Sequence, residues 1–204
     1  PLDIEMASEF GYRIKLLAIS RNHGDHVEAR VHPTMVPQGH LLASINGAYN
    51  AIQFHGDCAG NILLYGLGAG KVPTGSAVAA DVVDIARDIE YKCVGRVPPL
   101  AYLPSQLISR RVTSMDELLV PYYFRFTVLD QPGVLARIAG ILSSEEISIE
   151  SVIQKGRKEA GGTVSLVIVT HSANESSVER ALREIGTYEA VIKPAVKIRI
   201  LDQE

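Results

Sequence analysis

From residue 122 onward, apolar and polar positions repeat in an order that predicts strands and helices in turn. Residues 123–129 alternate, with Phe124, Phe126 and Val128 predicted to face inward, and residues 147–153, 163–170 and 191–200 are also strand-like. The order βαββαβ is typical of a ferredoxin-like fold. The apolar faces of the two helices are predicted at Val134, Leu135, Ile138, Ala139, Ile141 and Leu142, and at Val178, Ala181, Leu182 and Ile185.

Polar residues and a glycine mark the beginnings of these helices. Asp130 is predicted to cap the first helix, and Ser172 and Glu175 stand at capping-box spacing before the second. Gly133 lies at the junction of the first strand and the first helix, where backbone N–H groups can hold a carboxylate. A turn that satisfies only its own helix end is an equally favoured interpretation.

The first third of the chain predicts a helix followed by two pairs of strands. Residues 1–10 are predicted to form a helix that ends at Gly11, with Ile4, Ala7 and Phe10 on one side. Residues 12–19 and 27–31 are predicted to form a hairpin around the turn 21–25, and residues 49–54 and 61–65 a second pair around HGDCAG. Residues 32–40 are predicted to be irregular.

The strand 27–31 alternates strictly and is predicted to be half-buried. Its two faces carry Val27, Ala29 and Val31 on one side and Glu28, Arg30 and His32 on the other. Because His23, His26, His32, His40 and His171 fall in turns or on outer faces of strands, a solvated side chain is expected for each.

The stretch YGLGAGKVPTGSAVAAD, residues 65–81, contains alternating glycines followed by a helix. Thr74 or Ser76 is a candidate N-cap, and the helix carries an apolar stripe of Val78, Val82, Ile85, Ala86 and Ile89. The stretch fits neither a dinucleotide fingerprint, because Gly70 comes one position early, nor a phosphate loop, because Val72 follows Lys71. Ligand contact and a tight turn into a packed helix therefore both stay open.

Prolines without periodicity separate the two halves of the chain. Residues 97–106, VPPLAYLPSQ, hold three of the ten prolines, which indicates a linker over residues 93–120. The predicted division is a first domain over 1–92, this linker, and a second domain over 121–204. The predicted fold class is α+β, a mixed or antiparallel sheet with helices followed by the βαββαβ domain.

Composition excludes several classes of protein. The chain has 204 residues, of which 47% are hydrophobic and 21% charged, with a net charge of −3; these values indicate a globular protein and do not suggest nucleic acid or an anionic membrane as a partner. No apolar run has the length of a membrane span. The two cysteines, without a C-x-x-C motif, indicate reduced thiols in the cytosol. The acidic, helical first residues argue against a signal peptide, and the missing initiator Met suggests a piece of a longer protein.

Few residues suggest catalysis by themselves. His55, Asp57 and Cys58 invite a nucleophile or metal hypothesis, but they are contiguous in a glycine-bounded turn, so a polar hairpin turn is favoured. Lys15 is predicted to face solvent. No metal ligands and no catalytic residues are assigned.

Two segments resemble a known family. EARVHPTMVPQGHLLASINGAYNAIQFHGD and YGLGAGKVPTGSAVAADVVDIAR, with GYRIKLLAI before them, resemble the C-terminal part of the catalytic region of homoserine dehydrogenase. YYFRFTVLDQPGVLARIAGIL, with ISIESVIQ, resembles the ACT regulatory domain that follows it in many bacterial members. The resemblance covers nearly the whole chain except the linker.

The resemblance implies an NAD- or NADP-dependent oxidoreductase that interconverts aspartate semialdehyde and homoserine on the pathway to threonine and methionine. The family's Rossmann domain and catalytic lysine would precede residue 1, so this chain alone is expected to be inactive. At the glycine stretch the family's chain returns to the nucleotide domain. The residues implied to face the nicotinamide end of the cleft are Gly68, Ala69, Gly70, Thr74 and Ser76.

The ACT resemblance implies an amino-acid effector, threonine being the expected one, held between paired domains of a homo-oligomer. The implied effector residues are Asp130, Gly133, Val134, Leu135 and Ser148, the last where many amino-acid-binding ACT domains have Asn. The alternative is a non-enzymatic amino-acid sensor whose first half serves only for dimerisation. A third, weaker idea, a phosphate-binding protein using Gly70 and Lys71, is disfavoured by the failed phosphate-loop pattern.

Overall fold

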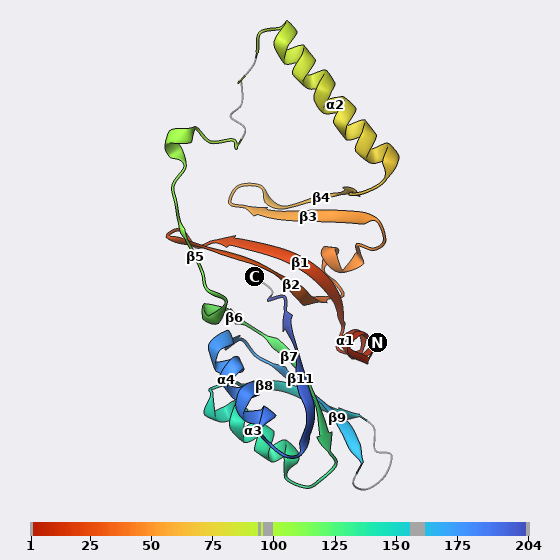
Figure 1. Ribbon diagram of the computed structural model, residues 1–204, viewed down its shortest axis with the longest axis vertical. Helices are drawn as coiled ribbons and strands as arrows, with labels where there is room; N and C mark the ends of the chain where they lie inside the picture. The colour runs from red at the N-terminus through yellow and green to blue at the C-terminus, as the bar shows by residue number, and fades with distance from the viewer. Residues whose placement is uncertain (1, 94, 96–99, 156–161, 203–204) are drawn as a thin grey trace. The chain divides into compact units, whose positions relative to one another are not determined.

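The computed structural model describes residues 2–93, 95, 100–155 and 162–202 (Figure 1). They form two compact units: residues 1–39 with 110–204, and residues 40–109. The predicted linker spans the boundary between the units, and its residues 94 and 96–99, like the predicted turn residues 156–161, lie outside the described residues. The division into 1–92, 93–120 and 121–204 follows the sequence patterns and stays a prediction.

The C-terminal part of the first unit has the predicted βαββαβ order. Its elements are β7 (Tyr122–Leu129), α3 (Val134–Ser144), β8 (Ile149–Lys155), β9 (Thr163–Thr170), α4 (Glu175–Gly186) and β11 (Val191–Ile200), with a two-residue strand, β10 (Ala173–Asn174), before α4. The four long strands lie in the order β11-β7-β9-β8, and the two helices cover one face (Figure 1). Side chains from β7, β9 and both helices fill the core, including Phe124, Phe126, Val128, Ile138 and Val178. The α+β prediction is confirmed.

The N-terminal hairpin extends this sheet. β1 (Tyr12–Asn22) pairs antiparallel with β2 (His26–Pro37), and β2 pairs in parallel with β11 at Thr34↔Arg199 and Met35↔Ile200. The other end of β2 pairs with β5 (Arg111–Val112) at His26 and Val27. The predicted hairpin is therefore confirmed, but residues 32–37 continue the strand, contrary to the prediction of an irregular segment.

A helix covers the opposite face of the sheet from α3 and α4. α1 (Leu2–Glu9) buries Met6 and Ala7 against Tyr123 and Met35, in a second apolar cluster that also includes Val167, Val169 and Ile200 (Figure 1). The predicted helix is confirmed, but Ile4, expected on its apolar side, is exposed. Tyr123 points to the face of the sheet opposite α3 and α4. It is nevertheless fully buried, because the apolar face of α1 covers it.

The predicted environment of β2 is reversed in the structure. Arg30 and His32 are only 6% and 7% exposed, whereas Val31 is 70% exposed. Thr34, on the polar face of β2, pairs with Arg199 of β11. The polar face of β2 and the side chain of Arg199 therefore lie on the same side of the sheet. The alternation of apolar and polar residues along β2 showed that its two faces differ, but the segments that pack on the strand decide which face is buried. The prediction of a solvated His32 was wrong.

Short elements before β7 also pack into the core of the first unit. β6 (Leu119–Val120) pairs with β10, and a 3-10 turn, η3 (Met115–Glu117), precedes it. Leu118 and Val120 are buried in the same core as Phe124. The last residues of the predicted linker thus contribute directly to the packing of the first unit.

The second unit contains η1 (Leu41–Ser44), the hairpin β3 (Tyr49–Gly56) and β4 (Gly60–Leu67), the helix α2 (Lys71–Glu90) and η2 (Pro104–Gln106). The hairpin confirms the predicted strand pair, and its turn contains Cys58. α2 buries none of its side chains. Within the described residues, no helix combines the length and apolar character needed to cross a membrane.

Candidate functional site

The turn between β4 and α2 holds the residues expected at the cofactor. α2 begins at Lys71, and Gly70 is its N-cap, with φ +129° and no side-chain capping bond. Thr74 and Ser76 therefore lie inside the first turns of the helix, and the prediction that one of them caps it was wrong. A positive φ at this position is readily adopted only by glycine, which accounts for Gly70 at the junction.

A side chain that the sequence reasoning missed lies against this turn. A Cβ atom built on Gly68 would lie 1.4 Å from Asn50 Nδ2 and 2.5 Å from Asn50 Cγ. The backbone N–H of Gly68 donates to the carbonyl oxygen of Ala48 at 3.3 Å. Only a residue without a side chain fits beside Asn50 in this arrangement. The register of β3 and β4, which a single sequence does not give, creates the contact.

The N-terminus of α2 is suited to a polar or anionic group. The first N–H groups of a helix have no partner inside the helix, and Pro73 has no N–H at all. Thr74 donates its N–H to the carbonyl oxygen of Gly70 at 3.0 Å. Among the described residues, no acceptor bonds the N–H groups of Lys71 and Val72, so both could donate to an outside acceptor.

The helix that follows presents its apolar stripe to solvent. Val78, Val82, Ile85 and Ile89 are between 58% and 64% exposed, although they recur at helical spacing. An exposed apolar stripe of this length is typical of a helix that packs on another protein segment. Gly68, Ala69, Gly70, Thr74 and Ser76 are likewise exposed, in one continuous turn beside this stripe.

The expected effector loop has a different helix cap from the predicted one. Gly133, not Asp130, is the N-cap of α3, with φ +90° in the left-handed region. Asp130 instead accepts a hydrogen bond from Gln154 Nε2 at 3.3 Å, and its N–H donates to the carbonyl oxygen of Gly162 at 2.9 Å. Val134 is buried, whereas Leu135, predicted to be buried, is 41% exposed beside the loop.

Ser148 does not join the other expected effector residues within one chain. Its carbonyl oxygen accepts from the N–H of His171 at 3.0 Å, next to the end of β9. That end of β9 pairs with Tyr123 at the beginning of β7, whereas Asp130 follows the end of β7. Asp130, Gly133, Val134 and Leu135 therefore cluster at one end of the domain, and Ser148 lies at the other.

A buried ion-pair network lies at the beginning of α4. Glu175 is 2% exposed and accepts from Tyr122 Oη at 2.7 Å. Arg199 donates to both of its carboxylate oxygens, from Nε at 2.7 Å and from Nη2 at 2.6 Å, and Lys197 forms a further ion pair with it. Burial opposes ionisation of the carboxyl group, but these hydrogen bonds outweigh it and lower the pKa of Glu175 to about 2.

This network corrects the prediction that Ser172 and Glu175 form a capping box. Asn174 is the N-cap of α4, because its side chain accepts from the N–H of Ser176 at 3.0 Å. Glu175 is turned instead toward β11. The alternation of Lys197 and Arg199 along β11 was visible in the sequence, but nothing in the sequence connected them to Glu175.

Next to this network, β2 buries polar atoms that lack a hydrogen-bond partner among the described residues. They include Arg30 Nη1 and His32 Nε2. Arg30 Nε lies 3.0 Å from a carboxylate oxygen of Glu28. Burial is the main cause that lowers the pKa of His32, and the positive charges of Arg199 and Arg30 add to it. His32 is thus neutral and structural at neutral pH.

The turn HGDCAG shows no catalytic geometry. His55 Nδ1 lies 3.0 Å from Asn61 Oδ1 across the hairpin, and Cys58 is free and exposed, as is Cys93. Among the described residues, no group of three or more His, Cys, Asp or Glu side chains is placed to hold a metal ion. The polar hairpin turn fits this geometry.

Two family models match the chain. Residues 1–83 match the homoserine dehydrogenase family, and residues 122–188 match the ACT domain. The first match includes the β4–α2 turn, and the second includes the Asp130–Leu135 loop. Both confirm the resemblance stated from the sequence.

Curated relatives agree with these matches. The chain is 44% identical to homoserine dehydrogenase from Neisseria gonorrhoeae, over 97% of this chain and 45% of that protein. It is 40% identical to homoserine dehydrogenase from Pseudomonas aeruginosa, over 97% of this chain and 46% of that protein. The chain therefore spans a little under half the length of these relatives.

Solved structures show the same correspondence. A homoserine dehydrogenase from Thiobacillus denitrificans is 40% identical and superposes with a TM-score of 0.87, over 98% of this chain and 45% of that chain. The enzyme from Staphylococcus aureus is 26% identical, with a TM-score of 0.62, over 98% of this chain and 45% of that chain.

Proposed function

We propose that the whole protein interconverts L-homoserine and L-aspartate 4-semialdehyde in the cytoplasm. The premise is that this chain corresponds to the C-terminal portion of a homoserine dehydrogenase followed by an ACT domain. The observation that carries the proposal is the homoserine dehydrogenase match over residues 1–83, which includes the glycine turn before α2. NAD or NADP would accept or supply the hydride. The product would serve the synthesis of threonine and methionine.

In this proposal the turn between β4 and α2 forms one wall of the cofactor cleft. Gly68, Ala69 and Gly70 let the backbone come close to the nicotinamide end, and the N–H groups of Lys71 and Val72 supply donors there. The exposed stripe of α2 would pack on the nucleotide-binding segment of the whole protein. No residue of this chain is assigned a catalytic role.

The ACT domain would bind an amino-acid effector, threonine being the expected one. Asp130, Gly133, Val134 and Leu135 would hold it in one copy. Because Ser148 lies at the opposite end of β7, it would contribute only from a second copy of the chain. This arrangement requires a homo-oligomer, and dimerisation is part of the proposal.

A chimaera tests the proposal. Residues 1–204, joined to the upstream segment of the Neisseria gonorrhoeae relative, are expected to oxidise homoserine with NAD or NADP, whereas residues 1–204 alone are expected to be inactive. The upstream segment alone, at equal concentration, is the control. A folded chimaera that binds threonine but never turns over homoserine would instead support the rival function, an amino-acid sensor without enzymatic activity.

A further inference from the structure

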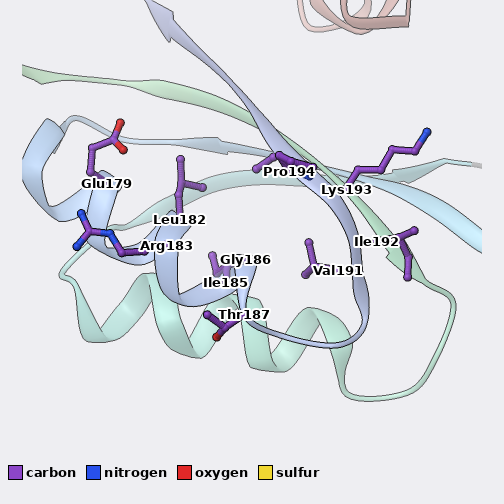
Figure 2. A pocket seen from close by; sticks show the side chains of 11 residues that line it. Glu179, Leu182, Arg183, Ile185, Gly186, Thr187, Val191, Ile192, Lys193 and Pro194 are labelled. Carbon is purple, nitrogen blue, oxygen red and sulfur yellow. The ribbon is translucent and has the colours of Figure 1, made fainter.

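A groove lies in the first unit, between the C-terminal half of α4 and the first residues of β11 (Figure 2). Its volume is about 640 Å³, and it is open to solvent. None of the expected effector residues lines it. Its lining includes Leu182, Ile185, Val191 and Ala195, together with Arg183 and Lys193.

The floor of the groove is apolar and firmly held. Ile185 is buried in the core of the domain, and Leu182, Val191 and Ala195 pack against that core. Burial of an apolar ligand against such a floor is favourable in proportion to the area removed from water. The floor therefore selects for an apolar molecular body.

The rim carries uncompensated positive charge. Glu179, the acidic residue of the lining, forms an ion pair with Lys197. Arg183 and Lys193 have no ion-pair or hydrogen-bond partner within the part of the chain that the structure describes, and Figure 2 shows them on opposite sides of the groove, with their charged ends extending outward from its floor. Two free cations beside an apolar floor are complementary to a carboxylate on an apolar body.

The edge of β11 disfavours an added strand as the occupant. β2 pairs with β11 only at Arg199 and Ile200, so residues 191–198 have an outer edge without a strand partner among the described residues. The pairing with β7 shifts register twice between Val191 and Val196, and Pro194 lies within the irregular stretch. Bulges, proline and lysine on an edge oppose the pairing of another strand, which leaves a small molecule as the better occupant.

We propose that this groove binds a small apolar carboxylate. Its body would rest on Leu182, Ile185 and Val191, and its carboxylate would pair with Lys193 or Arg183. The backbone connects the site to the expected effector loop, because the N–H of Leu129, next to Asp130, donates to the carbonyl oxygen of Ala190 at 2.9 Å. The proposal does not depend on dehydrogenase activity.

Two probes that differ only in charge test the proposal on the intact 204-residue chain. 4-Methylpentanoate is expected to shift the backbone amide NMR signals of Gly186, Lys193 and Ala195 in a saturable manner, whereas 4-methylpentanamide is expected to bind at least about tenfold more weakly. Shifts of equal size and midpoint with both probes, or no shifts in the groove, would overturn the proposal.

Matched variants identify the charges responsible. The double variant Arg183→Gln/Lys193→Gln is expected to weaken 4-methylpentanoate binding at least about tenfold. Arg13→Gln/Arg87→Gln, which removes two positive charges outside the groove, is expected to leave binding unchanged. Unaltered binding in the folded double variant contradicts the proposal. Groove signals that change with protein concentration instead of ligand would show that a second copy occupies the groove, and would also overturn it.

Discussion

Asp3 in α1 accepts two hydrogen bonds from Arg125 in β7, from Nε at 2.6 Å and from Nη2 at 3.0 Å. Tyr123 Oη adds a third at 3.1 Å. The two segments lie far apart in the sequence, one in the homoserine dehydrogenase match and one in the ACT match. The N-terminal helix is thus fastened to the first strand of the ACT domain by a charged side chain as well as by apolar packing.

Asp3→Asn is expected to lower the free energy of unfolding by about 1–2 kcal/mol, because it removes a charge-assisted pair at a partly buried site. The hydrogen bond from Arg125 is the main cause that lowers the pKa of Asp3. The contribution of Asp3 is therefore present above about pH 4, the unfolded value, and is lost as pH falls below it. Urea unfolding across this pH range measures both effects. Glu5→Gln on the same helix is the control, and equal effects of the two variants would contradict the prediction.

Glu175→Gln is expected to cost about 3–5 kcal/mol, because it leaves the Arg199 guanidinium partly buried without its counter-charge. Since the folded pKa of Glu175 is about 2, its contribution is complete above the unfolded value near pH 4.5 and is lost as pH falls toward 2. The variant should lack this acid-dependent loss in denaturant titrations. Glu179→Gln, which removes an exposed partner of Lys197, should cost less than about 1 kcal/mol. A similar cost for both variants would show that burial of Glu175 does not matter.

His32 is expected to make the fold less stable in mild acid. Its folded pKa is lowered, mainly by burial, so the unfolded chain binds the proton more readily. Stability is then complete above about pH 6.5 and falls as pH decreases below that value. The hydrogen bond with the backbone of Pro33 and the negative charge of Glu175 oppose this lowering of the pKa in part, whereas the positive charges of Arg199 and Arg30 reinforce it. His32→Gln should reduce the slope of stability against pH between about 5 and 6.5, whereas the exposed control His171→Gln should retain the slope.

Gly68→Ala is expected to destabilise the β3–β4 hairpin and the beginning of α2 by less than about 1 kcal/mol, because the new methyl group would overlap only the exposed side chain of Asn50. The flexible amide must rotate away. Asn50→Ala in the same chain should restore most of the loss, and a double-mutant cycle measured by thermal unfolding gives the coupling. Additive effects of the two substitutions would mean that the contact does not restrict residue 68.

The βαββαβ half of the fold was predictable because local pattern and global packing agree there. The predicted strands 163–170 and 191–200 coincide with β9 and β11, and Phe124, Phe126 and Val128 face the core as expected. Leu135 was predicted to be buried but is exposed. The N-cap of α3 is Gly133 and not Asp130, so Leu135 lies in the first turn of the helix, beside the loop. Helix periodicity gives a face, but the cap decides where the helix starts.

The junction between the hairpin and the ACT domain was not predictable from one sequence. Val31 and Arg30 alternate as any half-buried strand would, and the pattern assigned the wrong face to the interior. The polar face of β2 is covered by residues far away in the sequence: Arg199 of β11 pairs with Thr34, and Asp202 lies 3.9 Å from Arg30 Nη2. Likewise Asn50 reaches Gly68 only through the register of β3 and β4. Contacts of this kind depend on pairing between distant segments, for which a single chain carries no local signal.

The sheet shared by β2 and β11 limits how the ACT domain of this chain can be exchanged. If residues 121–204 alone were exchanged for another domain, Thr34 and Met35 of β2 would lose β11 as their strand neighbour, and the apolar side of α1 would be uncovered. The same cut would deprive the transplanted domain of the helix that covers Tyr123. A chimaera that exchanges the ACT domain should therefore carry residues 1–39 together with it.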